Sequence, residues 1–90
     1  MHERHYLLCY DIADPKRLGR IHRQCCKYGT PFQYSVFHLH CSAKVLEELL
    51  DTIEKLIDPG SDDVRAYAIS SVREITTLGE ALLPAGIHGG

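Results

Sequence analysis

The stretch HYLLCYDIADP, residues 5–15, decides how this chain folds. It begins as a short apolar run rich in strand formers and stops at Ala13, which predicts a buried strand over residues 5–12. Asp14 followed by Pro15 predicts a helix start, because a carboxylate accepts hydrogen bonds from free backbone N–H groups and proline fits the first helical turn. The sequence therefore predicts a strand that leads directly into a helix.

This first helix is expected to run to about Tyr28, with Gly29 just past its end as the C-cap. With about 100° between successive residues, one side of the helix is apolar and consists of Leu18, Ile21, His22 and Cys25. The opposite side carries a row of cations, called here the basic stripe, made of Lys16, Arg20, Arg23 and Lys27. Arg17 adds a further cation, and Asp14 is the single acid of the segment. Two interpretations stay open: a solvated face, or a surface that contacts phosphates.

Two more strands and a second helix are expected further along. PFQYSVFHLHC, residues 31–41, predicts one bent strand or two short ones, with His38 and His40 on the side opposite to the apolar residues. Ser42 is a predicted N-cap for a helix that reaches about Ile57. VRAYAI, residues 64–69, predicts another strand.

The predicted order is β-α-β-β-α-β, an α+β fold of the ferredoxin-like type. A single domain is expected over residues 1–79, with a short extra strand within residues 70–79 and a flexible tail at residues 80–90. Two helices would cover one face of the sheet, and the other face must meet water, a ligand or a second copy. A homodimer is the expected solution for so short a chain.

Composition narrows the class of protein. The chain has 90 residues, 44 % of them hydrophobic, and no apolar stretch approaching the roughly 18 residues that span a membrane. The first residues have no signal-peptide pattern, so a cytoplasmic protein is expected. The four cysteines form no CxxC pair and are expected to be packed thiols. The net charge is only −2, but the charges are unevenly distributed: residues 42–63 are acidic and the first helix is basic.

Asp11 is the candidate metal ligand and catalytic residue. Asp14 is the better helix cap, which leaves Asp11 without an obvious structural role, although it could bond N–H groups at the helix entry. Carboxylate oxygens are the ligands that Mg²⁺ and Mn²⁺ prefer, and Mg²⁺ takes one or two of them besides water and substrate phosphate. A two-fold axis near the end of the first strand would bring together the Asp11 residues of two copies.

Other side chains near these motifs allow more than one role. Tyr10, Ser35 and Phe37 could form the wall of a site around Asp11, or the two aromatic rings could pack in the core or in a dimer interface. His38, His40 and Cys41 resemble a set of metal ligands, but no further ligand at a characteristic spacing completes a zinc site. Whether they bind a metal stays open.

The combined motifs resemble the CRISPR-associated protein 2 family over residues 5–79. The likeness rests on Tyr10-Asp11-Ile12 at the end of the first strand, on the basic helix that follows, and on Gln33-Tyr34-Ser35-Val36-Phe37. The resemblance implies a ferredoxin-like homodimer in a prokaryotic cytoplasm that acts in spacer acquisition, the uptake of foreign DNA that underlies antiviral defence. It also implies a metal-dependent endonuclease acting on RNA or DNA, with Asp11 as the family's aspartate and Phe37 as its aromatic residue.

An alternative implied by the same resemblance is a DNA-binding scaffold that bridges two dimers of the CRISPR integrase and cleaves nothing. The nucleic-acid contacts expected in either case map onto Lys16, Arg17, Arg20, Arg23 and Lys27. Many family members carry a basic residue before the Gln-Tyr-Ser segment, where this chain has Thr30-Pro31-Phe32, so a phosphate contact is not expected there. A small-ligand regulatory domain of the same fold class is disfavoured by the basic stripe and by the lack of a glycine-rich loop.

Overall fold

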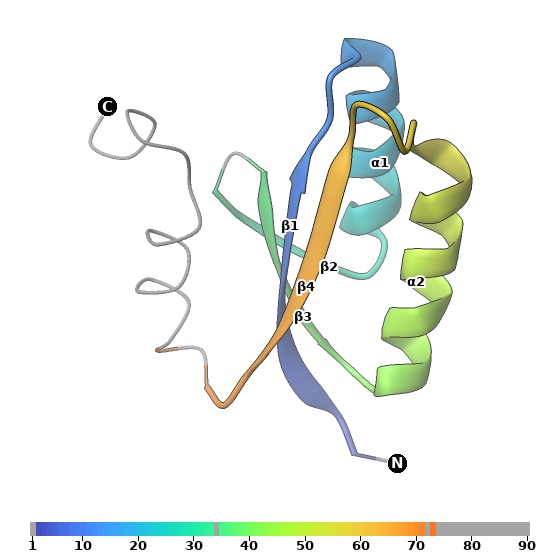
Figure 1. Cartoon of the computed structure of the whole chain (residues 1–90). Helices are drawn as coiled ribbons and strands as arrows, with labels where there is room; N and C mark the ends of the chain where they lie inside the picture. The colour runs from blue at the N-terminus through green and yellow to red at the C-terminus, as the bar shows by residue number, and fades with distance from the viewer. Residues whose placement is uncertain (1, 34, 72, 74–90) are drawn as a thin grey trace.

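The elements of the chain alternate as the sequence pattern predicts. The computed structural model describes residues 2–33, 35–71 and 73. Its elements are β1 (Arg4–Asp11), α1 (Pro15–Cys26), β2 (Gly29–Gln33), β3 (Val36–Cys41), α2 (Ala43–Leu56) and β4 (Asp63–Ile69). The strands form one antiparallel sheet in the order β2-β3-β1-β4, which puts the first strand of the chain inside the sheet. Both helices lie on the same face of that sheet (Figure 1).

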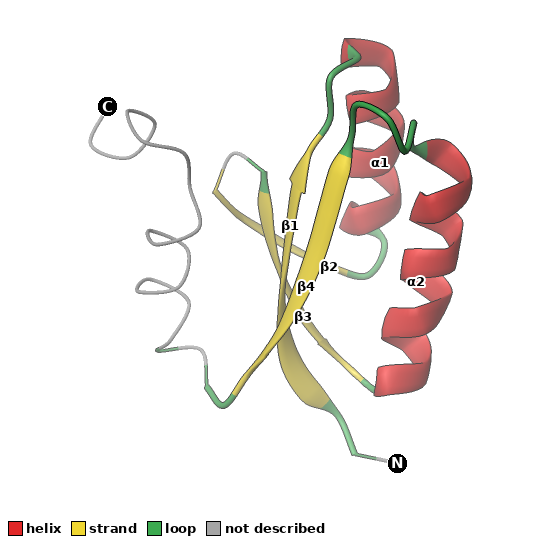
Figure 2. Ribbon diagram, in the orientation of Figure 1, coloured by secondary structure: helices red, strands yellow, loops and turns green. Residues whose placement is uncertain are grey.

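Most of the predicted elements are present. The segment 31–41, which allowed one strand or two, contributes to two strands that lie side by side as an antiparallel pair (Figure 2). The predicted extra strand within residues 70–79 and the predicted tail at residues 80–90 fall outside the described residues, except for residues 70, 71 and 73. Neither helix in the described part of the chain is long and apolar enough to cross a membrane.

Both predicted helix N-caps are confirmed. The backbone N–H of Arg17 donates to the Asp14 carboxylate at 2.9 Å, and Pro15 occupies the first turn of α1. The backbone N–H of Val45 donates to the Ser42 hydroxyl at 3.3 Å at the start of α2. These bonds satisfy N–H groups that have no partner within the helix itself.

Gly29 has a different role from the one predicted. Helix α1 ends at Cys26 with Lys27 as its C-cap, and Gly29 begins β2 opposite Leu39 of β3. A Cβ atom at Gly29 would lie 2.4 Å from the carbonyl oxygen of His38 and 2.4 Å from a methyl carbon of Leu39. The predicted C-cap is therefore wrong: the position needs glycine because the neighbouring strand approaches too closely for any side chain.

The core lies between the sheet and the helices. Successive side chains of each strand point alternately to the helix side and to the other face of the sheet, as the period of two requires. The helix-side cluster consists of Tyr6, Leu8, Tyr10, Phe37, Leu39, Cys41, Ile21, Cys25, Leu49 and Ile53. The other face of the sheet carries a second apolar cluster of Leu7, Val36 and Ile69, with Cys9 and Tyr67 packed against it.

The cysteines are free thiols, as the sequence predicted, but the prediction that they are packed is wrong for Cys26. All four are free, and Cys25 and Cys41 are buried while Cys26 is exposed. Burial, with a smaller contribution from Cys26, raises the pKa of the Cys25 thiol to about 12. Cys25 therefore stays protonated near neutral pH and acts as a small apolar side chain of the core.

Candidate active site

Asp11 is the last residue of β1 and is exposed. Tyr6, Leu8 and Tyr10 of the same strand belong to the helix-side core. Because successive side chains of a strand point to opposite faces, Asp11 lies on the face of the sheet that has no helix. Its carboxylate is thus presented at the end of a central strand, away from the core.

A second carboxylate, Asp63, stands directly opposite Asp11. Asp63 is the first residue of β4, and the antiparallel register pairs it with Asp11. Cβ atoms of such directly opposed residues are about 4.5–5.5 Å apart, so both carboxylates can reach one ion. Sequence reasoning missed Asp63 and counted it only among the acidic residues 42–63. Alternation within β4 could have indicated its side, because Val64 and Ala66 pack on the core.

Arg65 controls the charge around this pair. Its Nε donates to the Asp63 carboxylate at 2.9 Å, and both side chains are more than half exposed, at 65 % and 60 %. The ion pair orients Asp63 without burying it, and an exposed pair of this kind adds little to stability. An incoming cation therefore competes with Arg65 for Asp63. None of the ion pairs of the described residues includes Asp11, so the cation meets no such competitor there.

The pair fits a hard cation of the magnesium type. Within residues 2–33, 35–71 and 73, no group of three or more histidine, cysteine or acidic side chains is already arranged to hold a metal ion. Mg²⁺ does not need such a group, because it keeps several waters and takes one or two carboxylates together with substrate phosphates. Two exposed carboxylates on adjacent strands meet that requirement within one chain.

Of the three residues predicted to form the wall of the site, only Ser35 lies outside the helix-side core. The Ser35 carbonyl accepts a hydrogen bond from the Tyr10 N–H at 3.1 Å, which places the backbone of Ser35 beside the end of β1. The rings of Tyr10 and Phe37 lie on the helix side, with centroids 6.0 Å apart. These two rings are therefore core residues, and they do not line the surface that carries Asp11.

His22 is packed, as the sequence predicted. Its Nδ1 lies 3.3 Å from the Tyr10 hydroxyl, and its ring meets Phe37 edge-on at a centroid distance of 5.2 Å. Burial is the largest cause that raises the pKa of the Tyr10 hydroxyl well above its usual value, with Cys25 and Cys26 adding to it. Tyr10 is thus a neutral hydrogen-bonding residue of the core and has no ionised form to offer at neutral pH.

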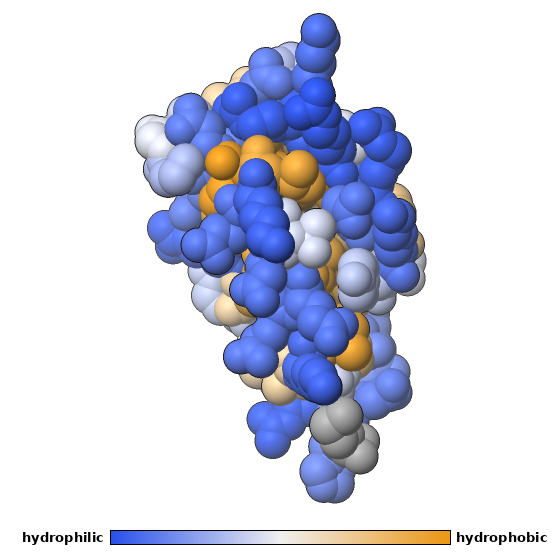
Figure 3. Space-filling model, turned by 90° about the vertical axis from the view of Figure 1, so that its right-hand side faces the viewer, coloured by the Kyte–Doolittle hydropathy of each residue, from blue (hydrophilic) through white to orange (hydrophobic). Residues whose placement is uncertain are grey.

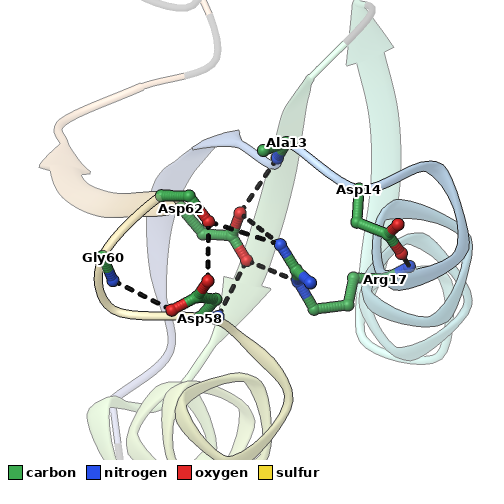
Figure 4. Close-up of polar contacts among 7 residues, drawn as sticks. Ala13, Asp14, Arg17, Asp58, Gly60 and Asp62 are labelled. Carbon is green, nitrogen blue, oxygen red and sulfur yellow. Dashed lines mark hydrogen bonds and ion pairs between the residues drawn. The ribbon is translucent and has the colours of Figure 1, made fainter.

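Arg17, a predicted nucleic-acid contact, forms an ion pair within the chain and keeps a quarter of its side chain exposed. Its Nε and Nη2 atoms donate to the two carboxylate oxygens of Asp62 at 2.8 and 3.1 Å (Figure 4). The Asp62 carboxylate also accepts from the backbone N–H groups of Ala13 at 2.9 Å and Asp58 at 2.8 Å, and its side chain is fully inaccessible to solvent. This Asp62 network joins the turn between β1 and α1 to the loop between α2 and β4, close to the ends that carry Asp11 and Asp63.

Acid should loosen the Asp62 network. The Arg17 guanidinium is the largest cause that holds the pKa of Asp62 far below its usual value, and backbone N–H groups of Asp58 and Ala13 add to it. Because the folded pKa lies below the unfolded one, the stabilisation is complete above about pH 4 and is lost as the pH falls towards the folded pKa. We expect Asp62→Asn to melt at a lower temperature than the wild type at pH 7, and the gap to narrow below about pH 4.

Thermal melts from pH 7 down to pH 3 would measure this gap. Asp51→Asn is the matched control, because Asp51 is exposed on α2 and takes no part in the network. A gap for Asp62→Asn that stays constant across this range would contradict the assigned role of the carboxylate.

The basic stripe remains accessible. All four residues of the stripe are exposed: Lys16, Arg20 and Arg23 on α1, and Lys27 at its C-cap. Figure 3 views the side of the molecule formed by the helices and shows mostly hydrophilic side chains with hydrophobic residues between them. The stripe lies on the helix side and Asp11 on the other side of the sheet, so the two predicted parts of the site are not brought together within one chain.

The predicted ligand set of His38, His40 and Cys41 is divided between the two faces. Cys41 is buried and belongs to the helix-side core, whereas His38 and His40 alternate onto the other face. The residue that joins these two histidines is His5 of β1, which pairs with His40 in the sheet register. Cys41 can therefore not complete a site with both histidines.

Comparisons with known proteins agree with this architecture. The family model described as CRISPR associated protein Cas2 matches residues 4–74. A relative from Nitrosomonas europaea, named CRISPR-associated endoribonuclease Cas2 1, is 39 % identical over 83 residues, which cover 92 % of this chain and 79 % of the relative. A relative from Thermus thermophilus, named CRISPR-associated endonuclease Cas2 2, is 32 % identical over 79 residues, 88 % of each chain.

Solved structures show the same arrangement. The crystal structure of a hypothetical protein, TT1823, from Thermus thermophilus superimposes with a TM-score of 0.74 at 32 % identity, covering 77 % of this chain and 84 % of that one. Streptococcus pyogenes Cas2 shares the fold, with a TM-score of 0.68 over 91 % of this chain and 99 % of that one. With a family match across both helices and all four strands, and relatives this similar over most of their length, the chain belongs to the CRISPR-associated protein Cas2 family.

Proposed function

We propose that this chain is a CRISPR-associated endonuclease that hydrolyses phosphodiester bonds with Mg²⁺ or Mn²⁺ held by Asp11 and Asp63. The observation that carries the proposal is the register of β1 and β4, which opposes two exposed carboxylates at a strand end. The names of the relatives, endoribonuclease and endonuclease, support the same activity.

The chemistry expected of this site is simple. A bound divalent ion would stabilise the charge that develops on the phosphate and help to activate water. Asp11 and Asp63 would supply oxygen ligands, and Arg65 would keep Asp63 oriented until the ion competes for it. The backbone of Ser35 would form part of the wall of the site, since its carbonyl accepts a hydrogen bond from the Tyr10 N–H of β1. Asp11 is the residue on which the activity should depend most, because it has no competing cation among the ion pairs of the described residues.

We further propose a ferredoxin-like homodimer that works in the prokaryotic cytoplasm with the CRISPR integrase. The β-α-β-β-α-β order and the strand order β2-β3-β1-β4 support that topology. The face of the sheet without a helix carries the apolar cluster of Leu7, Val36 and Ile69, which favours a second copy there. Such a dimer could bring the two Asp11 residues towards one another and enlarge the carboxylate set.

RNA is the first substrate to test, because most of the relatives' names specify an endoribonuclease. The alternative of a scaffold that binds DNA and cleaves nothing is not favoured by those names. The two functions share the fold and the basic stripe, so only a cleavage assay separates them.

The test is cleavage of labelled single-stranded RNA and duplex DNA by the purified wild-type protein, with Mg²⁺ or Mn²⁺ and with a chelator. We expect cleavage that requires the metal and that stops when the chelator is added. Products that appear equally in the chelated reaction would point to a contaminating or metal-independent nuclease. Absence of cleavage of both substrates would make the scaffold the better hypothesis.

The basic stripe should govern the salt dependence of binding. Replacing Arg20 or Arg23 with glutamine is expected to lower the slope of log affinity against log salt by about one unit for each phosphate that the variant no longer neutralises. Fluorescence anisotropy with a labelled duplex at several salt concentrations measures the slope. Lys44→Gln is the matched control, because Lys44 is an exposed cation on α2 outside the stripe. Equal slopes for wild type and stripe variants would move the nucleic-acid surface elsewhere.

A further inference from the structure

Asp11 and Asp63 meet at the weakest point of their strand pair. They form the last pair of the β1–β4 ladder, and beyond it β1 leads into α1 while the chain before β4 comes from α2. The end of a ladder is where paired strands fray, and like charges directly opposite each other destabilise the pairing. The ladder alone therefore holds these two carboxylates less firmly than it holds the pairs further inside.

The side chain of Asp62 joins the two strands just past this last pair. Continuing the register by one residue would place Asp62 opposite Ile12. Its carboxylate accepts from the backbone N–H of Ala13 at 2.9 Å, so it supplies a bond between the two segments where the ladder has ended. Asp62 is the direct neighbour of Asp63 in the chain. Ala13 is two residues from Asp11, so this bond closes the end of the sheet that carries both exposed carboxylates.

The Asp62 carboxylate is itself fixed from two further sides (Figure 4). Arg17 of α1 donates to both of its oxygens, the paired geometry that holds a carboxylate in one orientation. The backbone N–H of Asp58, just after α2, donates to it at 2.8 Å. The carboxylate thus accepts four hydrogen bonds and is inaccessible to solvent, so it has little freedom to move.

We propose that Asp62 is a positioning residue for the metal site of Asp11 and Asp63, and that it keeps these two carboxylates close enough to share one ion. The inference rests on the proposed function, because it assigns Asp62 a task in the same site. Successive side chains of an extended chain point to opposite sides, so Asp62 is anchored against α1 while Asp63 faces the helix-free side. Asp62 touches neither the ion nor the substrate, and it acts through the backbone that leads into Asp63.

A purely structural role of the Asp62 network predicts a different result. If the network only stabilised the fold, its loss would lower the melting temperature and leave the metal affinity of the folded protein unchanged. If it positions the carboxylates, the folded variant binds metal more weakly, because the ion must first bring together two groups that repel each other. Partners that orient metal ligands typically contribute about 10–100-fold to affinity or activity.

The experiment is titration of the full chain with Mn²⁺ alone at neutral pH, followed by the electron paramagnetic resonance signal of the free ion. Loss of binding in Asp11→Asn assigns the ion to this site. We expect Asp62→Asn to bind Mn²⁺ about tenfold more weakly than the wild type. In cleavage assays it should need about tenfold more Mn²⁺ for half of its maximal rate, while the maximal rate itself changes little.

Asp58→Asn is the matched control for charge. It removes the same charge from the same loop, but the Asp58 carboxylate bonds to Gly60 and Ser61, so every bond to Asp62 stays in place. This variant should bind Mn²⁺ as the wild type does. Gly29→Ala controls for stability, because it should destabilise the fold at the contact between β2 and β3 and leave the Asp62 network intact.

Hydrogen exchange without metal tests the same inference independently of cleavage. In Asp62→Asn the backbone amides of residues 11–13 should lose more protection than those of residues 6–8 in the middle of β1, whereas Gly29→Ala should show no such difference. Unchanged relative protection, or a fall in Mn²⁺ affinity that Gly29→Ala shares, would overturn the inference. A wild type that binds no Mn²⁺ would refute the proposed function and this inference with it. A wild type and an Asp62→Asn protein that bind Mn²⁺ equally well would refute the inference alone.

Discussion

Replacing Asp11 with asparagine is expected to lower the rate of metal-dependent cleavage at least about a hundredfold, because removal of one preorganised group that stabilises the developing charge costs about 10²–10³ in rate. Asparagine keeps the size of the side chain and removes its charge, so the ion loses the carboxylate that Arg65 does not hold. The measurement is the cleavage rate of labelled RNA at saturating Mg²⁺ and at saturating Mn²⁺.

Asp63→Asn gives the comparison within the same site. We expect a smaller loss, about tenfold, since Asp63 is already shared with Arg65 and its loss leaves Asp11 in place. More Mg²⁺ should recover part of the rate for Asp63→Asn, whereas Asp11→Asn should stay impaired. Both residues are exposed, so neither variant should melt more than slightly below the wild type. A folded Asp11→Asn protein that cleaves at the wild-type rate would remove Asp11 from the active site.

Replacing Gly29 with alanine is expected to destabilise the fold by about 1–3 kcal/mol, the usual cost of adding a methyl group to a well-packed region. The added carbon would meet the His38 carbonyl oxygen at 2.4 Å, and a backbone atom in a paired strand cannot turn away. For a domain of this size each kcal/mol corresponds to about 4–8 °C in melting temperature. Urea unfolding and a thermal melt measure the change.

Gly19→Ala is the matched control for the same chemical change. Gly19 lies within α1, and a Cβ atom there would meet only the end of the Arg23 side chain at 3.5 Å. Alanine in a helix interior is favoured over glycine by about 0.5–1 kcal/mol, so this variant should be more stable than the wild type. If the two substitutions changed stability equally, in either direction, the close approach of β3 would not be what excludes a side chain at Gly29.

The faces of the helices and strands could be predicted from the sequence, because they follow from local periodicity. The period of about 3.6 residues separates the basic stripe of α1 from its core side, and the period of two puts Phe37 and Leu39 on the core and His38 and His40 on the other face. The helix caps at Asp14 and Ser42 are equally local, because the bonded atoms are three residues apart. These features could be predicted without knowledge of the tertiary structure.

Features that depend on long-range register could not be predicted in this way. Asp63 meets Asp11, and His5 meets His40, only once the strands are aligned, and a shift of one residue would separate both pairs. The ion pair of Arg17 could not be predicted either, because its partner Asp62 is 45 residues away. Gly29 was predicted as a C-cap because a glycine commonly follows the end of a helix. The close approach of β3 to Gly29 depends on the tertiary structure and cannot be inferred from the local sequence.

The central place of β1 also constrains how the chain is made. β1 leaves the ribosome before both of its neighbours in the sheet, β3 and β4, and its His5 pairs with Ile69 of β4. Until residues 63–69 have been synthesised, one edge of an apolar strand stays without its backbone partners. Nascent chains of this protein therefore pass through an interval in which β1 can pair with a strand of another chain, and chains released before residue 63 should aggregate rather than fold.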